Sequence, residues 1–240
     1  MKITLIELFQ YLKRPHVIKN IEKPIKGNLV KLFYLFLFTY VLKVIWLLTI
    51  NSYIREKYAV DQSDIADTEQ QSLWLFFLLA VIVYPVVEEF IFRYHLKAKK
   101  IISLIIVCLI TMLSGYWLVK GINLPSLLIK RIVLITASVI PATLIIYVYI
   151  KKLKTKQLET FYNKWFFIPF YISVFAFALV HAFNFEVPGS AFLIIPFIIP
   201  MLISGMVLGY ARIKYGMWAN IALHMGFNLS TFILDKVFGI

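Results

Sequence analysis

Long apolar stretches alternate with short polar segments along this chain of 240 residues. A helix rises 1.5 Å per residue, so about 20 apolar residues are enough to cross the hydrocarbon of a bilayer. Several of the stretches approach or exceed that length. The pattern therefore predicts seven spans, at residues 32–50, 72–96, 101–119, 128–150, 165–185, 190–211 and 217–236.

Composition agrees with a membrane protein, because 61% of the residues are hydrophobic, only 15% are charged and the mean hydropathy is +0.84. We expect an all-α fold, a polytopic transmembrane bundle of about seven spans around a polar intramembrane cavity. Residues 1–31 carry charges through a weakly apolar stretch and show no signal-peptide cleavage site. They are predicted to form a cytoplasmic interfacial segment in front of a transmembrane domain over residues 32–240.

The net charge of +13 does not call for a nucleic-acid partner, because basic residues gather in the cytoplasmic loops of membrane proteins. With the N-terminus inside, 17 Lys or Arg fall on the cytoplasmic side and six on the other. This asymmetry predicts a multi-pass protein of a cell membrane with its C-terminus outside and lipid as its surroundings. Richness in Lys, Ile and Phe points to a low-GC bacterium, and hence to the bacterial inner membrane.

Proline and glycine mark special positions inside the spans. Pro85 lies in the second span, where a neighbouring helix can satisfy the carbonyl that proline leaves without a donor. Gly205 and Gly209 have the small-xxx-small spacing that lets another helix approach closely. We expect this spacing to serve packing within the chain rather than dimerisation.

Four ionisable residues lie at membrane depth: Lys43, Glu88, Glu89 and Arg93. A charge there costs from about 3 to more than 10 kcal/mol, so such residues mark function by default. Lys43 stands alone and is expected to snorkel. Glu89 and Arg93 are i,i+4 neighbours with the acid first, so they are predicted to pair. Glu88 is rotated by about 100° from Glu89, and one arginine does not serve both acids.

Two histidines lie in other spans, His181 in the fifth and His224 near the start of the seventh, with Asn228 one helical turn after His224. A single histidine in an apolar helix usually makes a helix-helix hydrogen bond. An ionic staple between helices would explain Glu89 and Arg93 but not Glu88, and Glu88 with two histidines suits a reactive site. His95 adjoins a lysine cluster and is expected at the interface.

These groups supply the parts of a hydrolytic site in two alternative ways. In the first, Glu88 and His181 share and deprotonate a water, while His224 and Asn228 donate hydrogen bonds to the developing oxyanion. In the second, Glu88, His181 and His224 bind zinc, whose open fourth position holds the water. The chain lacks a His-Glu-x-x-His pair, so zinc as cofactor stays open. We favour the metal-free form.

Three motifs in order resemble those of the CPBP family of intramembrane proteases, also called the CAAX protease and bacteriocin-processing or Abi family. A Glu-Glu-x-x-x-Arg motif begins at Glu88, a Phe-x-x-x-His motif ends at His181 and a His-x-x-x-Asn motif begins at His224. The resemblance covers roughly residues 84–232. It departs from the family at Tyr94, where glycine is usual, and in two additional spans between the first two motifs, an even number that preserves the direction of the His181 helix.

The resemblance implies an all-helical membrane fold and cleavage of a membrane-associated peptide or protein, prenylated CAAX proteins being substrates of some members. Carried over to this chain, Glu88 and His181 activate water, Glu89 with Arg93 supports the site, and His224 with Asn228 forms the oxyanion hole. The family is often labelled metalloprotease, although a metal-free glutamate mechanism is also argued for it.

Two other classes of function remain as alternatives. The first is a non-catalytic immunity or scaffold protein that keeps the polar site as a staple. The second is a small proton-coupled transporter, in which intramembrane Glu, His and Lys form a proton relay. No inverted repeat is evident in the sequence, which disfavours the transporter.

Overall fold

The computed structural model describes residues 1–18, 22, 26–58, 61–62, 72–97, 160, 162–186 and 191–238. The predicted spans 101–119 and 128–150 lie outside the described residues. The α-helices are α1 (Lys2–Lys13), α2 (Lys26–Trp46), α3 (Ser52–Tyr58), α5 (Leu73–Phe77), α6 (Tyr84–Arg93), α10 (Phe167–Val180), α11 (Ile195–Tyr215) and α12 (Met217–Phe238).

Short helical turns of other types extend several of these helices. The π-helical turns are η1 (Leu47–Asn51) and η2 (Leu78–Val83), and the 3-10 turns are η3 (Tyr94–Leu96), η4 (His181–Asn184) and η5 (Ala191–Ile194). Extended structure in the described residues is limited to an antiparallel pair of two-residue strands, β1 (Asp61–Gln62) and β2 (Phe185–Glu186). The expected all-α fold is therefore confirmed.

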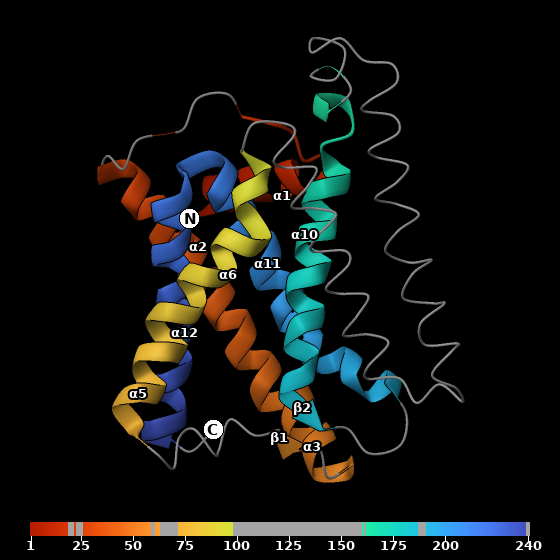
Figure 1. Cartoon of the computed structure of the whole chain (residues 1–240), viewed down its shortest axis with the longest axis vertical. Helices are drawn as coiled ribbons and strands as arrows, with labels where there is room; N and C mark the ends of the chain where they lie inside the picture. The colour runs from red at the N-terminus through yellow and green to blue at the C-terminus, as the bar shows by residue number, and fades with distance from the viewer. Residues whose placement is uncertain are drawn as a thin grey trace.

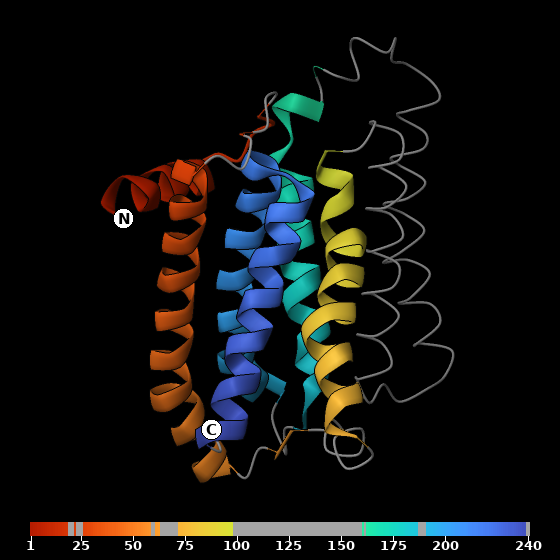
Figure 2. The same cartoon turned by 90° about the vertical axis from the view of Figure 1, so that its left-hand side faces the viewer.

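The long helices stand side by side, with α2 crossing α6 obliquely in the view of Figure 1, and α1 lies across one end of this bundle (Figure 1, Figure 2). The chain runs away from that end in α2, returns in α5 and α6, leaves in α10, returns in α11 and leaves again in α12 (Figure 1). Helix α10 thus begins at the end where α6 finishes, which agrees with the predicted even number of spans between them.

Three helical stretches in the described part of the chain are long and apolar enough to cross a membrane: Gly27–Tyr58, Leu73–Leu96 and Phe192–Tyr215. Helix α10 is apolar but has only 14 residues, and it ends before the predicted limit at residue 185. The protein is therefore a membrane protein, while the number of seven spans stays a prediction.

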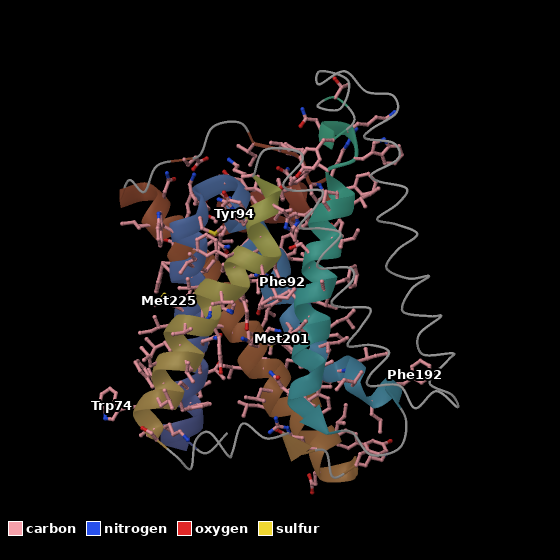
Figure 3. The ribbon with its side chains drawn as sticks, in the orientation of Figure 1. Trp74, Phe92, Tyr94, Phe192, Met201 and Met225 are labelled. Atoms are coloured by element: carbon pink, nitrogen blue, oxygen red, sulfur yellow. The ribbon has the colours of Figure 1, made fainter. Side chains whose placement is uncertain are left out.

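Large aromatic side chains mark both ends of the bundle. Trp74 and Phe192 project outward at the end opposite α1 (Figure 3), and each is about four-fifths exposed. Trp218, at the start of α12, is exposed at the end where α1 lies. Aromatic side chains concentrate at the two membrane-water interfaces, so this distribution agrees with helices that span a bilayer.

Two glycines bring α11 close to α10. A Cβ on Gly209 would lie 2.8 Å from the ring of Phe170, and one on Gly205 would lie 3.3 Å from Val174. The close contact confirms that the small-xxx-small spacing serves packing within the chain. The contact also determines which face of α10 points inward. The buried Phe177 lies on that face about one turn after Val174, and His181 follows Phe177 after one more turn.

Basic residues near the end of α11 correct one expectation. The predicted spans 190–211 and 217–236 leave Arg212 and Lys214 in a loop between them, among the 17 basic residues counted as cytoplasmic, but both lie within α11 and are buried. Lys214 pairs with Glu7 of α1 at 2.5 Å, and Arg212 donates to the carbonyl of Arg93 at 3.1 Å. These cations are buried because each has found acceptors on a neighbouring segment, α1 in one case and the end of α6 in the other.

Candidate active site

A fully buried carboxylate organises the site. Glu89 of α6 accepts from Arg93 at 2.5 Å, which confirms the predicted i,i+4 pair, and neither side chain has exposed surface. The same oxygen, Oε1, accepts from Nδ1 of His224 at 2.8 Å, and Oε2 accepts from the amide of Asn220. Three donors around one carboxylate offset the cost of burying its charge.

Asn220 is a site residue that the sequence analysis missed. It lies on α12 four residues, or about one helical turn, before His224, with a fully buried side chain. The signal was present, since an asparagine four residues before a functional histidine shares its helix face. An amide is uncharged, however, so membrane depth alone did not single it out.

The ring of Phe177, in the Phe-x-x-x-His motif, contacts three other site residues. Its centroid lies 4.2 Å from the Arg93 guanidinium, 4.5 Å from the ring centroid of His181 and 5.6 Å from that of His224. Its carbonyl, one of the last four of α10, accepts from Nδ1 of His181 at 2.8 Å. Phe177 therefore orients both histidines and covers the buried ion pair.

Glu88 does not share the hydrogen bonds of Glu89 and lies near the Nε2 atoms of both histidines. Its Oε2 is buried and has no hydrogen-bond partner among the described residues. Nε2 of His224 lies 3.7 Å from this oxygen and Nε2 of His181 lies 3.9 Å from it. These distances are too long for direct hydrogen bonds. They leave a carboxylate oxygen and two imidazole nitrogens facing a space that one small group can share.

The hydrogen bonds of the two rings determine which nitrogen is free for chemistry. Nδ1 of His224 donates to Glu89, and Nδ1 of His181 donates to the Phe177 carbonyl. Nε2 is then the acceptor in each neutral ring, and it becomes a donor when the ring is protonated. Both Nε2 atoms point towards Glu88, so both rings present their reactive nitrogen to the same place.

Asn228 makes a different contact from the one expected. Its amide donates to the carbonyl of Ala80, in the π-helical turn η2, at 2.8 Å. In a π-helix this carbonyl would accept from the backbone nitrogen of Pro85, five residues later, and proline has no N–H. A neighbouring helix thus satisfies the freed carbonyl, as expected for Pro85, and Asn228 keeps one further amide N–H.

The structure therefore brings together five of the six predicted site residues through the contacts above, namely Glu88, Glu89, Arg93, His181 and His224. Asn228 lies one turn along α12 from His224 and is linked to η2. His95, expected at the interface, has a fully buried side chain. It lies in η3, past the end of α6, and is not among the residues that contact Glu88.

Comparison with known proteins agrees with this geometry. A family model described as type II CAAX prenyl endopeptidase Rce1-like matches residues 70–230, which is more than half of the chain and includes all three motifs. The chain belongs to this family. It is the CPBP family, so the chain is a membrane protease. No curated protein and no solved structure matches the chain.

The departure from the family pattern after the motif arginine has a simple explanation. Tyr94 has a right-handed helical backbone, with φ of −58° and ψ of −42°. This conformation suits any residue, so glycine is not needed here. The side chain points outward, half-exposed, and stacks on Phe90 with ring centroids 5.9 Å apart. The tyrosine side chain therefore lies away from the buried Glu89–Arg93 pair on α6.

The zinc alternative requires Glu88, His181 and His224 to surround one point. Zinc-ligand bonds of about 2.0 to 2.1 Å in a tetrahedron set the ligand atoms about 3.3 Å apart. The carboxylate-to-imidazole distances of 3.7 and 3.9 Å are wider than that. No group of three or more His, Cys, Asp or Glu side chains in the described ranges has an arrangement that could hold a metal. The side chains as placed do not fit zinc.

Proposed function

We propose that the protein is an intramembrane endopeptidase that hydrolyses a peptide bond of a membrane-associated peptide or protein with a water activated by Glu88 and His181. The observation that carries the proposal is the buried, unpartnered Oε2 of Glu88, faced by two imidazole nitrogens within 4 Å. A buried carboxylate oxygen without a donor costs folding free energy. Such costly groups are typical of functional sites, so we assign Glu88 a role in chemistry. Family membership supplies the class of reaction.

In the proposed first step, a water lies between Oε2 of Glu88 and Nε2 of His181. Glu88 accepts a proton from the water while His181 holds the second hydrogen, and the resulting hydroxide attacks the scissile carbonyl carbon. The carbon becomes tetrahedral and its oxygen gains a negative charge. When the C–N bond breaks, Glu88 returns the proton to the leaving amine.

The oxyanion is assigned to α12. Nε2 of His224 stands across the same space from His181 and donates when the ring carries a proton, with the Glu89 carboxylate at Nδ1 to balance that charge. Asn228 contributes the amide N–H that its bond to Ala80 leaves over. Glu89, Arg93 and Asn220 act as positioning residues, because Glu89 holds the His224 ring while Arg93 and Asn220 hold Glu89.

Two observations support the proposed substrate class, one from the position of the site and one from the family. The site lies between apolar helices, so a substrate must partition into the membrane to reach it. The matching family is named for CAAX prenyl proteins, which carry a lipid near the C-terminus. A lipidated peptide or protein terminus is therefore the proposed substrate, and the enzyme acts without a zinc cofactor.

Cleavage of a quenched-fluorescence farnesylated peptide by the purified protein tests the proposal. Wild type should cleave, and Glu88→Gln should lower kcat by about 10²- to 10⁴-fold, the usual contribution of a general base. Glu56→Gln changes an exposed acid on α3 and serves as the matched control. A wild-type protein with no peptidase activity on a panel of lipidated peptides, or full activity of Glu88→Gln, would refute the mechanism.

We also propose that the N-terminus is cytoplasmic and the C-terminus outside, on the strength of the lysine asymmetry. Cysteines introduced singly at positions 64 and 154, in a background that replaces the single Cys108, test this orientation. An impermeant maleimide added to intact cells should label position 64 and not position 154. The reverse labelling would overturn the topology but leave the chemistry of the site untouched.

A further inference from the structure

Lys43 is the one charge at membrane depth that the mechanism above does not use. It is the only charged residue between Lys31 and Arg55 and lies 12 residues from each. At helical rise those flanking charges are about 18 Å away in both directions. A four-carbon stem does not cover that distance, so the expected snorkelling to an interface does not account for Lys43.

Lys43 lies on the face of α2 that packs into the bundle. Leu35 and Thr39, two turns and one turn earlier, are fully buried, and the indole of Trp46 donates to the carbonyl of Pro196 at 2.8 Å. The Lys43 ammonium lies 5.6 Å from the ring centroid of Phe227, the residue before Asn228. Lys43 thus borders the proposed site from a helix that carries none of the family motifs.

This ammonium has no carboxylate partner in the part of the chain that the structure describes. The sequence shows why the two additional spans do not provide one: no Asp or Glu occurs between Glu89 and Glu159. Glu89 is already engaged by three donors. A cation-π contact contributes about 0.5 to 2 kcal/mol, whereas a charge at membrane depth costs about 3 kcal/mol or more. Among the described residues the ammonium therefore lacks an anion.

We propose that Lys43 binds the free C-terminal carboxylate of the substrate and thereby fixes how far from the terminus the bond is cut. The inference rests on the proposed function, because it assumes that a peptide lies over Glu88 and His181. Every free peptide C-terminus carries a carboxylate, and a carboxylate pairs with an ammonium through a charge-assisted hydrogen bond. Lipid phosphates lie at headgroup depth, about 15 Å from the bilayer centre, and match the position of Lys43 poorly.

Binding of two farnesylated fluorescent peptides, one ending in a carboxylate and the other in a carboxamide, tests the proposal. The measurement uses Glu88→Gln in nanodiscs, so that binding is followed without turnover. The free acid should bind about 10- to 100-fold more tightly than the amide, the range expected for a hydrogen bond between charged groups. Lys43→Met should remove this preference by weakening the acid alone, whereas Lys57→Met, at an exposed position on α3, should retain it.

Other results would overturn the role of Lys43. One such result is equal binding of the acid and amide peptides, or no binding of either. Another is a Lys43→Met variant that binds both peptides more weakly by the same factor. An amidated peptide with an aspartate one residue earlier that binds as well as the free acid would show that the terminus is not what is recognised.

Cleavage by the active enzyme separates this inference from the proposed function. Binding that depends on Lys43 and the carboxylate, without cleavage, would leave the carboxylate-binding role of Lys43 standing but refute the protease mechanism and, with it, the role of Lys43 in placing the cut. Cleavage of acid and amide peptides with the same kcat/KM would refute the inference and leave the mechanism standing.

Discussion

Glu88 and Glu89 are adjacent in sequence and identical in chemistry, yet they belong to different environments. Glu89 has no exposed surface, and Arg93, His224 and Asn220 all donate to its carboxylate. Glu88 keeps about a quarter of its side chain exposed, and its Oε2 has no hydrogen-bond partner in the described part of the protein. One step along a helix turns the side chain by about 100°, which is enough to separate the two.

The difference shows how one helix turn provides both a framework and a reactive group. A buried charge that is fully paired stabilises a unique arrangement of its partners, and loss of one partner leaves the others uncompensated. A carboxylate left partly unpaired costs stability but remains free to exchange a proton. We therefore assign structure to Glu89 and chemistry to Glu88, and the two assignments make opposite predictions for stability.

The largest effect on stability is expected for Glu89→Ala. It leaves Arg93 buried without its acid, and breaking a buried pair in this way costs about 3 to 5 kcal/mol. Glu88→Ala, the matched variant one residue earlier, should leave stability unchanged or raise it, because it removes an unpartnered carboxylate. Thermal unfolding of both variants in the same detergent measures the difference.

A lower unfolding temperature for Glu88→Ala than for Glu89→Ala would reverse the assignment. Glu89→Gln sharpens the comparison, since it keeps the shape but removes the charge. If the charge itself holds the network, Glu89→Gln should lose most of the stability that Glu89→Ala loses.

A smaller effect is expected for Asn220→Ala. The change removes one of three donors to Glu89 while Arg93 and His224 still donate, so the loss should be about 1 to 3 kcal/mol. The His224 ring would also be held less firmly, so kcat should fall more than KM changes. Ser230→Ala, which removes a local hydroxyl bond elsewhere on α12, is the control. Unaltered unfolding and kcat for Asn220→Ala would show that the amide contributes nothing to the network.

No effect is expected from removal of metal. The donor atoms of Glu88, His181 and His224 are set wider than a zinc ion would hold them, so treatment of purified protein with a strong chelator should leave the rate of peptide cleavage unchanged. Metal analysis of the treated and untreated samples accompanies the assay. Stoichiometric zinc whose removal abolishes cleavage, and whose return restores it, would contradict this prediction.

Much of the site could be predicted from the sequence because the cost of charge in lipid makes its members conspicuous. Glu88, Glu89 and Arg93 stood out on an apolar span, and the Glu89–Arg93 pair followed from helix geometry alone. Asn220 did not stand out, since an uncharged amide is tolerated in a membrane helix. Arg212 was misplaced in a loop because the sequence does not reveal the backbone carbonyls of Arg93 and Tyr94 that accept from it.

Local patterns in the sequence determined the helices, their membrane-spanning length and apolar character, and the pairing of Glu89 with Arg93 one turn later, since these depend on hydropathy and helical periodicity. Tertiary structure alone decided the contacts between helices. Packing of the helices places the Asn228 amide at the carbonyl of Ala80 and Lys43 beside Phe227. It also directs the Nε2 atoms of both histidines towards Glu88. The contact between Lys43 and Phe227 joins residues 184 positions apart. Contacts of this kind depend on helix rotation and depth, which packing sets and periodicity does not record.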